Sequence, residues 1–188
     1  PESVHAWASA EAPAEFHATH HAVARTYTYY LHAPEADTAA ARDALDRLSG
    51  SHDFHNLTPD DTGTQRDLST ALSRSGPILE LTFEAGGFAR QLVRRLVSLV
   101  EEVACGDAAL DRIDRVLSPE ELSGPHGVMA APAYPLVLTG VEYPQLDFAA
   151  DSNAADARAV FDDQRREYTT RARVAETISR GIDDSLTE

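Results

Sequence analysis

The chain has 188 residues, enough to bury one substantial core, and it contains neither a membrane-spanning apolar run nor a second cysteine for an internal disulfide. It carries 31 acidic residues against 16 basic ones, a formal net charge of −15, and all 16 are arginine because the sequence has no lysine. This composition is typical of proteins from a cytosol with a high salt concentration. In dilute buffer the negative charge argues against a nucleic-acid partner. In molar salt that argument weakens, because the Debye length falls to about 3 Å.

Two strands are predicted near the start of the chain. Residues 3–8 alternate in polarity, which predicts a short strand. The second half of residues 16–31 is aromatic and β-branched, which predicts a longer strand. Because side chains alternate between the two faces of a strand, Tyr27 and Tyr29 are expected to share one face.

A helix is predicted over residues 37–48, where Asp37 or Thr38 can cap its first turn and Gly50 can end it. The side chains expected to be buried on this helix are Ala41, Ala44, Leu45 and Leu48. A polar loop is expected after it, over residues 58–64.

Histidines suggest two possible sites, and each has a simpler interpretation. His17, His20 and His21 could bind a metal ion, but no cysteine or suitably spaced carboxylate accompanies them, so a loop leading into a strand is favoured. The adjacent pair His52 and Asp53 could be catalytic, although a hydrogen-bonded structural corner is the favoured interpretation.

Residues 84–106 hold the pattern around which the chain is organised. They follow a strictly alternating segment, residues 78–83, which predicts a strand. Gly86 marks the break between that strand and a predicted central helix, and Gly106 is the expected left-handed stop. The apolar residues that recur at helical spacing are Phe88, Leu92, Leu96, Leu99 and Val103.

Three arginines, Arg90, Arg94 and Arg95, lie in the first half of this apolar stretch. An arginine on such a helix needs a carboxylate, a phosphate or water at its tip. They could extend along the edge of the helix into water, or one of them could present its guanidinium to a reaction site.

The last part of the chain predicts four further elements. Residues 107–117 predict a short helix, and residues 118–121 form a capping box that should begin another. A loop rich in proline and alanine covers residues 124–135, and residues 136–143 predict the last strand. From about residue 151 the spacing of apolar residues predicts a C-terminal helix.

Strands interleaved with helices, some with one polar face, predict an α+β fold with a largely antiparallel sheet and helices packed on one side. We expect residues 1–150 to form one domain and residues 151–188 to be a helical tail packed on it.

Four groups of residues occur in an order that resembles one known family: residues 16–18 with 24–29, residues 48–54, residues 87–95, and residues 131–133 with 136–143. The family that they resemble is tRNA pseudouridine synthase A, and the missing lysine suggests its members from salt-loving archaea.

The resemblance implies that the protein isomerises uridine to pseudouridine in the anticodon stem-loop of tRNA, at positions 38 to 40. It implies no metal and no organic cofactor, and a homodimer with tRNA crossing both subunits. In the family an aspartate attacks the uridine while a tyrosine and an arginine support it, and Tyr27 and Arg94 match these two. The further residues expected to bind the RNA are Phe16, His17, Arg25 and Arg90.

The sequence departs from the family pattern at the aspartate, which the family carries in an Arg-x-Asp-x-Gly motif. Asp61 precedes Thr-Gly but follows Pro59-Asp60, so it does not match. Because Pro1 is not an initiator residue, we expect the chain to be a piece of a longer protein. Because the family carries the aspartate in its N-terminal half, the resemblance implies that this piece is the C-terminal half and is inactive alone. The alternative is a non-catalytic RNA-binding or dimerisation domain of the same fold. Pro135, where the family usually has glycine, is a smaller departure.

Overall fold

The computed structural model describes residues 4–122 and 127–186 of the chain. These residues form two compact units. The larger unit comprises Phe16–Pro144, and the smaller one combines the described parts of Pro1–Glu15 and Gln145–Glu188. Part of the loop predicted over residues 124–135 lies outside the described residues, and its remainder, residues 127–135, has no regular secondary structure.

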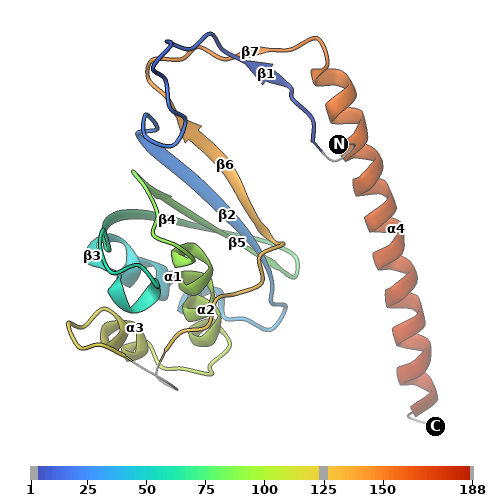
Figure 1. Ribbon diagram of the computed structural model, residues 1–188. Coiled ribbons are helices and arrows are strands. Elements are labelled where there is room, and N and C mark those ends of the chain that lie inside the picture. Colours follow the sequence, from blue (N-terminus) through green and yellow to red (C-terminus); the bar gives the residue numbers. More distant parts are fainter. Residues whose placement is uncertain (1–3, 123–126, 187–188) are drawn as a thin grey trace. The chain divides into compact units, whose positions relative to one another are not determined.

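The larger unit contains a five-stranded sheet in the order β3-β4-β5-β2-β6, with every neighbouring pair antiparallel (Figure 1). This confirms the predicted α+β class with an antiparallel sheet. The strands are β2 (Ala24–His32), β3 (Gly50–Asp53), β4 (Gln65–Ser75), β5 (Ile78–Ala85) and β6 (Leu136–Glu142).

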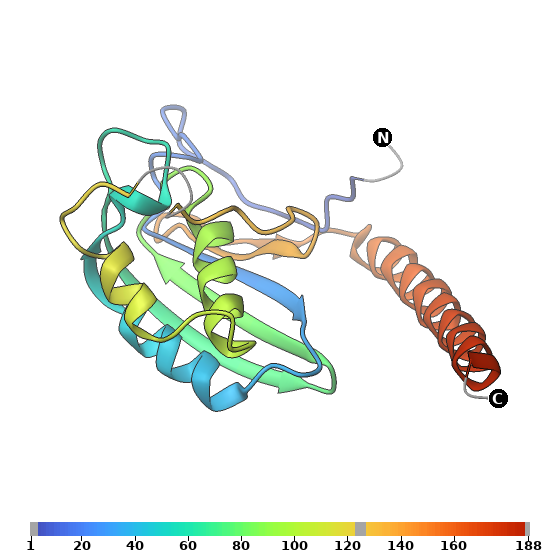
Figure 2. The ribbon, with the colours of Figure 1, turned by 90° about the horizontal axis from the view of Figure 1, so that it is seen from below.

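Helices α1 (Thr38–Leu48) and α2 (Leu92–Ala104) lie beside each other on one face of this sheet (Figures 1 and 2). The Asp37 carboxylate caps α1 by accepting hydrogen bonds from the backbone N–H groups of Ala39, at 2.7 Å, and Ala40, at 3.3 Å. The predicted cap and buried face of α1 are therefore both confirmed. Shorter helical segments follow as η1 (His55–Leu57) and α3 (Asp111–Val116), the latter shorter than predicted.

The core lies between the sheet and these helices. Strands β2 and β5 pair so that Tyr29 lies opposite Leu81, and both side chains are buried on the helix-covered face. On the other face, the Thr28 hydroxyl lies within hydrogen-bonding distance of the hydroxyls of Thr82 (3.4 Å) and Thr139 (3.1 Å). The sheet thus has one apolar face and one polar face, as antiparallel sheets commonly do.

Helix α2 begins later than its apolar pattern predicted. Gln91 precedes the helix with a left-handed backbone (φ 62°), and the residues from Gly86 to Gln91 form a turn. Phe88 and Ala89 fit the helical spacing but pack against the core from this turn, so periodicity alone could not separate them from the helix. The predicted stop is confirmed, because Gly106 has φ 80°.

Strands β3 and β4 were not predicted. β4 carries polar residues on both of its faces, and Leu68 is its one fully buried side chain, so the alternation that reveals a half-buried strand is weak there. Gly50, predicted to end α1, instead starts β3 with φ 92°.

The helix predicted to begin in residues 118–121 is absent from the described part of that region, where residues 118–122 form bends and coil. The side chain of Asn56 explains this. Its amide nitrogen donates to the carbonyls of Val116 (3.0 Å) and Glu120 (2.9 Å), and its amide oxygen accepts from the Leu122 N–H at 2.8 Å. The bonds to Glu120 and Leu122 occupy groups that a helix in this region would use along its own axis.

In the smaller unit, β1 (Ala8–Ser9) pairs antiparallel with β7 (Ala149–Ala150), and α4 (Ala154–Leu186) follows. The strand predicted over residues 3–8 is therefore mostly wrong, and β6 is not the last strand. The C-terminal helix is confirmed, while its packing on the larger domain stays a prediction. None of the described helices is both long and apolar enough to cross a membrane.

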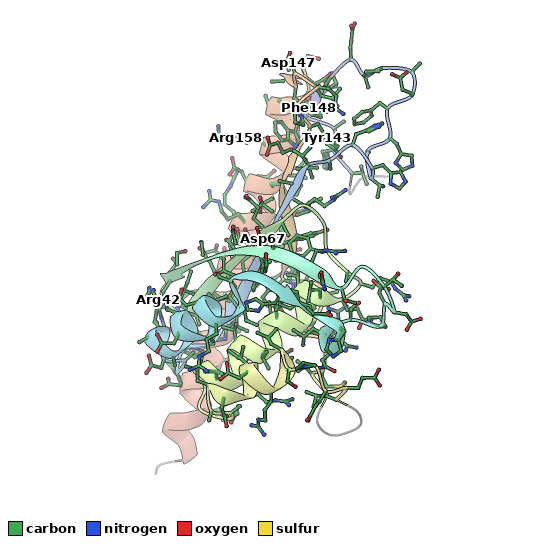
Figure 3. The ribbon with its side chains drawn as sticks, turned by 90° about the vertical axis from the view of Figure 1, so that its left-hand side faces the viewer. Arg42, Asp67, Tyr143, Asp147, Phe148 and Arg158 are labelled. Atoms are coloured by element: carbon green, nitrogen blue, oxygen red, sulfur yellow. The ribbon has the colours of Figure 1, made fainter. Side chains whose placement is uncertain are left out.

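The surface carries the charge. Arg42 on α1 and Asp67 on β4 are exposed (Figure 3), and α4 carries exposed ion pairs between residues three or four apart, such as Arg171 with Glu167 at 2.6 Å. Pairs of this kind stabilise a helix only weakly and are screened by salt. They do not balance an excess of 15 negative charges, which leaves net repulsion among surface carboxylates.

We expect the melting temperature to rise as salt increases from about 0.1 M to about 3 M, because the screening length falls from about 10 Å to below 3 Å. Thermal unfolding followed by circular dichroism would measure this change. A melting temperature that is flat or falls over that range would refute the adaptation to salt inferred from the composition.

Candidate functional site

A pocket of about 320 Å³ opens where β2, the turn before α2 and the start of β6 meet. Strand β2 contributes Tyr27, the first turn of α2 contributes Arg94, and β6 contributes Leu136. Tyr27 and Arg94, the two residues that match the family's tyrosine and arginine, thus line the same pocket although they are far apart in the sequence. Its full lining is Tyr27, Phe88, Ala89, Arg90, Gln91, Leu92, Val93, Arg94 and Leu136.

Tyr27 forms one wall of this pocket with Phe88. Their rings meet edge to face, with centroids 5.2 Å apart and planes inclined at 88°. Such contacts are favourable beyond the area that they bury, so Phe88 fixes the tilt of the Tyr27 ring. The Tyr27 side chain is half-buried, so part of it stays accessible to a ligand.

Arg94 is held by the backbone of the loop before β6. Its Nε donates a hydrogen bond to the carbonyl of Ala131, whose own N–H donates to the Arg94 carbonyl at 3.0 Å. The sequence allowed a carboxylate, a phosphate or water as the partner of this arginine. Within the described residues no acid forms an ion pair with Arg94, and Glu102 lies 3.5 Å from Arg112 instead. A neutral carbonyl therefore holds its Nε.

Arg90 also lines the pocket, but its guanidinium is paired. The Asp60 carboxylate accepts from the Arg90 backbone N–H at 2.8 Å and from its Nε at 2.5 Å. The backbone bond, followed by the side-chain bond, lowers the pKa of Asp60. Asp60 thereby fixes the turn that presents Phe88 and precedes the left-handed Gln91, and strain of that kind concentrates at functional sites.

The other residues expected to bind RNA lie outside the pocket lining. Arg25 donates to the carbonyls of Gly86, at 2.8 Å, and Thr19, at 2.5 Å, so it ties the loop before β2 to the turn before α2. Phe16 and His17 belong to that loop, where Phe16 packs on His21 with ring centroids 5.5 Å apart. Their role in binding RNA stays a prediction.

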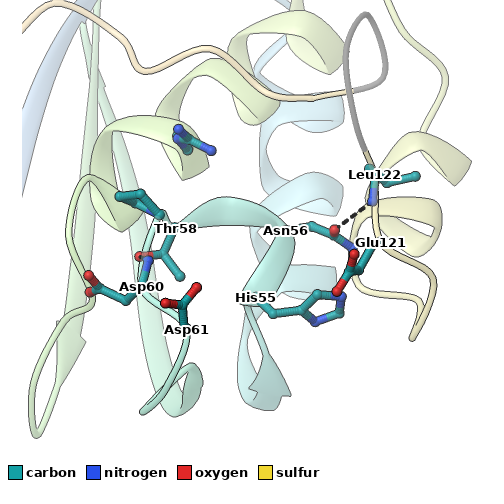
Figure 4. Close-up of a pocket in the computed structure, with 9 residues that line it drawn as sticks. His55, Asn56, Thr58, Asp60, Asp61, Glu121 and Leu122 are labelled. Carbon is teal, nitrogen blue, oxygen red and sulfur yellow. Dashed lines mark hydrogen bonds between the residues drawn. The ribbon is translucent and has the colours of Figure 1, made fainter.

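A second pocket, of about 450 Å³, lies beside η1 and is lined by Arg95 among others. Figure 4 shows Asp60 and Asp61 on one side of it and His55 with Glu121 on the other. Asp61, which does not match the family's aspartate motif, thus lines a different pocket from Tyr27 and Arg94.

The histidines predicted to be structural make local hydrogen bonds. The His17 N–H donates to Nδ1 of His21 at 2.8 Å, and the His52 ring nitrogen Nε2 lies 2.9 Å from the Ser49 carbonyl. Asp53 accepts from the His55 N–H at 3.1 Å, as expected for a structural corner. Over residues 4–122 and 127–186, no cluster of three or more histidine, cysteine or acidic side chains has the arrangement of a metal site.

The sequence alone did not reveal three parts of the site: the Phe88 wall, the Asp60 bond to Arg90, and the Ala131 carbonyl. Phe88 was predicted in a helix but lies in the turn before it, and Asp60 and Ala131 lie in segments that were predicted only as loops. The glycine pair before Phe88 was the one available signal, because it marked a turn where the backbone reverses.

Residues 44–144 match the family described as tRNA pseudouridine synthase. The chain is 52% identical over 192 residues to the tRNA pseudouridine synthase A of Haloarcula marismortui, covering 97% of this chain and 70% of that protein. It is 54% identical over 182 residues to the protein of the same name from Natronomonas pharaonis, covering 95% and 68%. A protein of that name from Methanothrix thermoacetophila is 33% identical over 183 residues, covering 96% and 67%.

Proposed function

The chain belongs to the tRNA pseudouridine synthase family, and we propose that it supplies the tyrosine and the arginine of a site that converts uridine to pseudouridine in the anticodon stem-loop, at positions 38 to 40. The observation that carries this proposal is the convergence of Tyr27 and Arg94 on one pocket. Similar proteins come from salt-loving archaea, which agrees with the acidic, lysine-free composition of this chain.

The reaction breaks the N1–C1′ bond of uridine, forms a C5–C1′ bond, and moves the C5 proton to N1. A base inside paired RNA must first leave the stack. Tyr27 can then offer the flipped uracil a ring on which to stack, and its phenol can accept or relay the C5 proton. Phe88 keeps that ring in place from the edge.

Arg94 keeps its charge at any working pH, and its guanidinium can hold a carboxylate through two parallel hydrogen bonds. We propose that this carboxylate is the nucleophilic aspartate of an Arg-x-Asp-x-Gly segment, which the 188 residues do not contain. The hydrogen bond to Ala131 uses only Nε, so the two terminal nitrogens of Arg94 could bind such a partner.

The purified 188-residue chain should therefore bind tRNA weakly and form no pseudouridine, whereas the full-length protein should form it. Release of tritium from tRNA that carries 5-tritiated uridine would measure pseudouridine formation by the 188-residue chain and by the full-length protein. Turnover by the chain alone would disprove the missing aspartate and make Asp61 a candidate again.

The second candidate function is a non-catalytic RNA-binding or dimerisation domain of the same fold. One result distinguishes the two functions, because a full-length protein that binds tRNA without releasing tritium would be such a domain.

We further propose that the protein is a homodimer located in the cytoplasm. Light scattering in molar salt would measure its mass.

A further inference from the structure

The segment Ala131–Pro132 is bound from two sides by hydrogen bonds. From α2, Arg94 exchanges two bonds with Ala131, one through its Nε and one through its carbonyl. From β2, the Tyr29 hydroxyl donates to the Pro132 carbonyl at 3.1 Å. The same two-residue segment thus joins a buried tyrosine to the arginine of the candidate site.

Tyr29 is too buried to touch a substrate, since it is 2% exposed. It shares the helix-covered face of β2 with Tyr27, two residues earlier, so the two side chains are neighbours along that face. Pro132 has no N–H, so its carbonyl is its single backbone hydrogen-bonding group. The Tyr29 hydroxyl is therefore well placed to fix this residue.

The surroundings of Tyr29 keep its hydroxyl protonated. Burial raises the pKa of Tyr29, the nearby negative charge of Glu101 raises it further, and the charge of Arg94 opposes both. A hydroxyl that stays protonated remains a hydrogen-bond donor over the working pH range.

We propose that Tyr29 is a positioning residue that holds the Arg94 guanidinium in place through Pro132 and Ala131. This inference rests on the proposed function, because it assumes that Arg94 takes part in the reaction. Without the hydroxyl, the Pro132 carbonyl loses its donor, and the segment that holds Arg94 Nε can shift. A displacement of about 1 Å at a reacting group can cost about 10²-fold in rate.

The test uses the full-length protein with Tyr29→Phe and a matched control, Tyr30→Phe. Tyr30 is the next residue of β2, lies on the other face and is 42% exposed. Single-turnover rates are measured with enzyme in saturating excess over tRNA, where a partly unfolded preparation does not change the rate constant as long as the folded enzyme stays in excess. We expect Tyr29→Phe to lower the rate constant about tenfold, with the dissociation constant for tRNA within about twofold, and Tyr30→Phe to leave both unchanged.

The same substitution in an Arg94→Lys background separates positioning from a general packing defect. If Tyr29 acts through Arg94, Tyr29→Phe should change the rate of that variant by less than about twofold, because the two changes are then coupled. An equal tenfold loss in both backgrounds, or no loss in the wild-type background, would overturn the inference. A wild-type protein without turnover would instead overturn the proposed function.

Discussion

Replacing Tyr27 by phenylalanine in the full-length protein should abolish pseudouridine formation while the affinity for tRNA survives. The change keeps the ring that Phe88 contacts edge to face and removes only the hydroxyl, the group proposed to move the C5 proton. Tritium release and tRNA binding, measured on the same preparation, separate the two effects.

Tyr27→Leu is the companion variant, because it removes the ring face as well. If stacking is the whole contribution of Tyr27, the phenylalanine variant will be nearly as active as wild type and the leucine variant will be impaired. A fully active Tyr27→Leu protein would show that Tyr27 has no part in the site.

Arg94→Ala should lower the rate of the chemical step by about 10²-fold or more, the scale of losing one preorganised electrostatic group. The expected reason is the loss of a fixed cation that lines the pocket beside Tyr27 and would hold the attacking carboxylate. Single-turnover kinetics would measure the step without interference from product release.

Arg95→Ala is the matched control for that substitution. Arg95 is the next residue of α2, about 100° further round the helix, and it lines the second pocket rather than the one with Tyr27. It should therefore cost far less in the chemical step. Equal losses from the two variants would mean that the wrong face of α2 had been assigned to the reaction.

The sequence predicted the elements that have a strong apolar period. Strand β5 and helix α1 combine regular alternation or helical spacing with clear ends, so both were predicted, and the buried residues of α1 were correct. Strand β4 was missed because residues 65–75 bury little on either face, and the start of α2 was misplaced because Phe88 fits a helix while lying in a turn.

The site was predictable only in part. Its two proposed functional residues could be found from the sequence, but the backbone groups that hold Arg94 could not. The resemblance pointed to Tyr27 and Arg94, and the fold brings them to one pocket. The groups that hold Arg94 could not be read from residue types, since any residue at positions 131 and 132 would present a carbonyl. The partner of Arg94 was therefore left open between a carboxylate, a phosphate and water, whereas the structure has the carbonyl of Ala131.

The carbonyl that holds Arg94 has a consequence for how this enzyme family could move between habitats of different salinity. Dissolved ions weaken attraction between exposed opposite charges, but they act much less on a half-buried bond between a guanidinium and a neutral carbonyl. Acidic residues could therefore accumulate on the outside of an ancestral protein, or be removed again, without moving the guanidinium. A version of this chain with lysines restored at exposed positions would be expected to keep the same arrangement of Arg94 and Ala131 in dilute buffer.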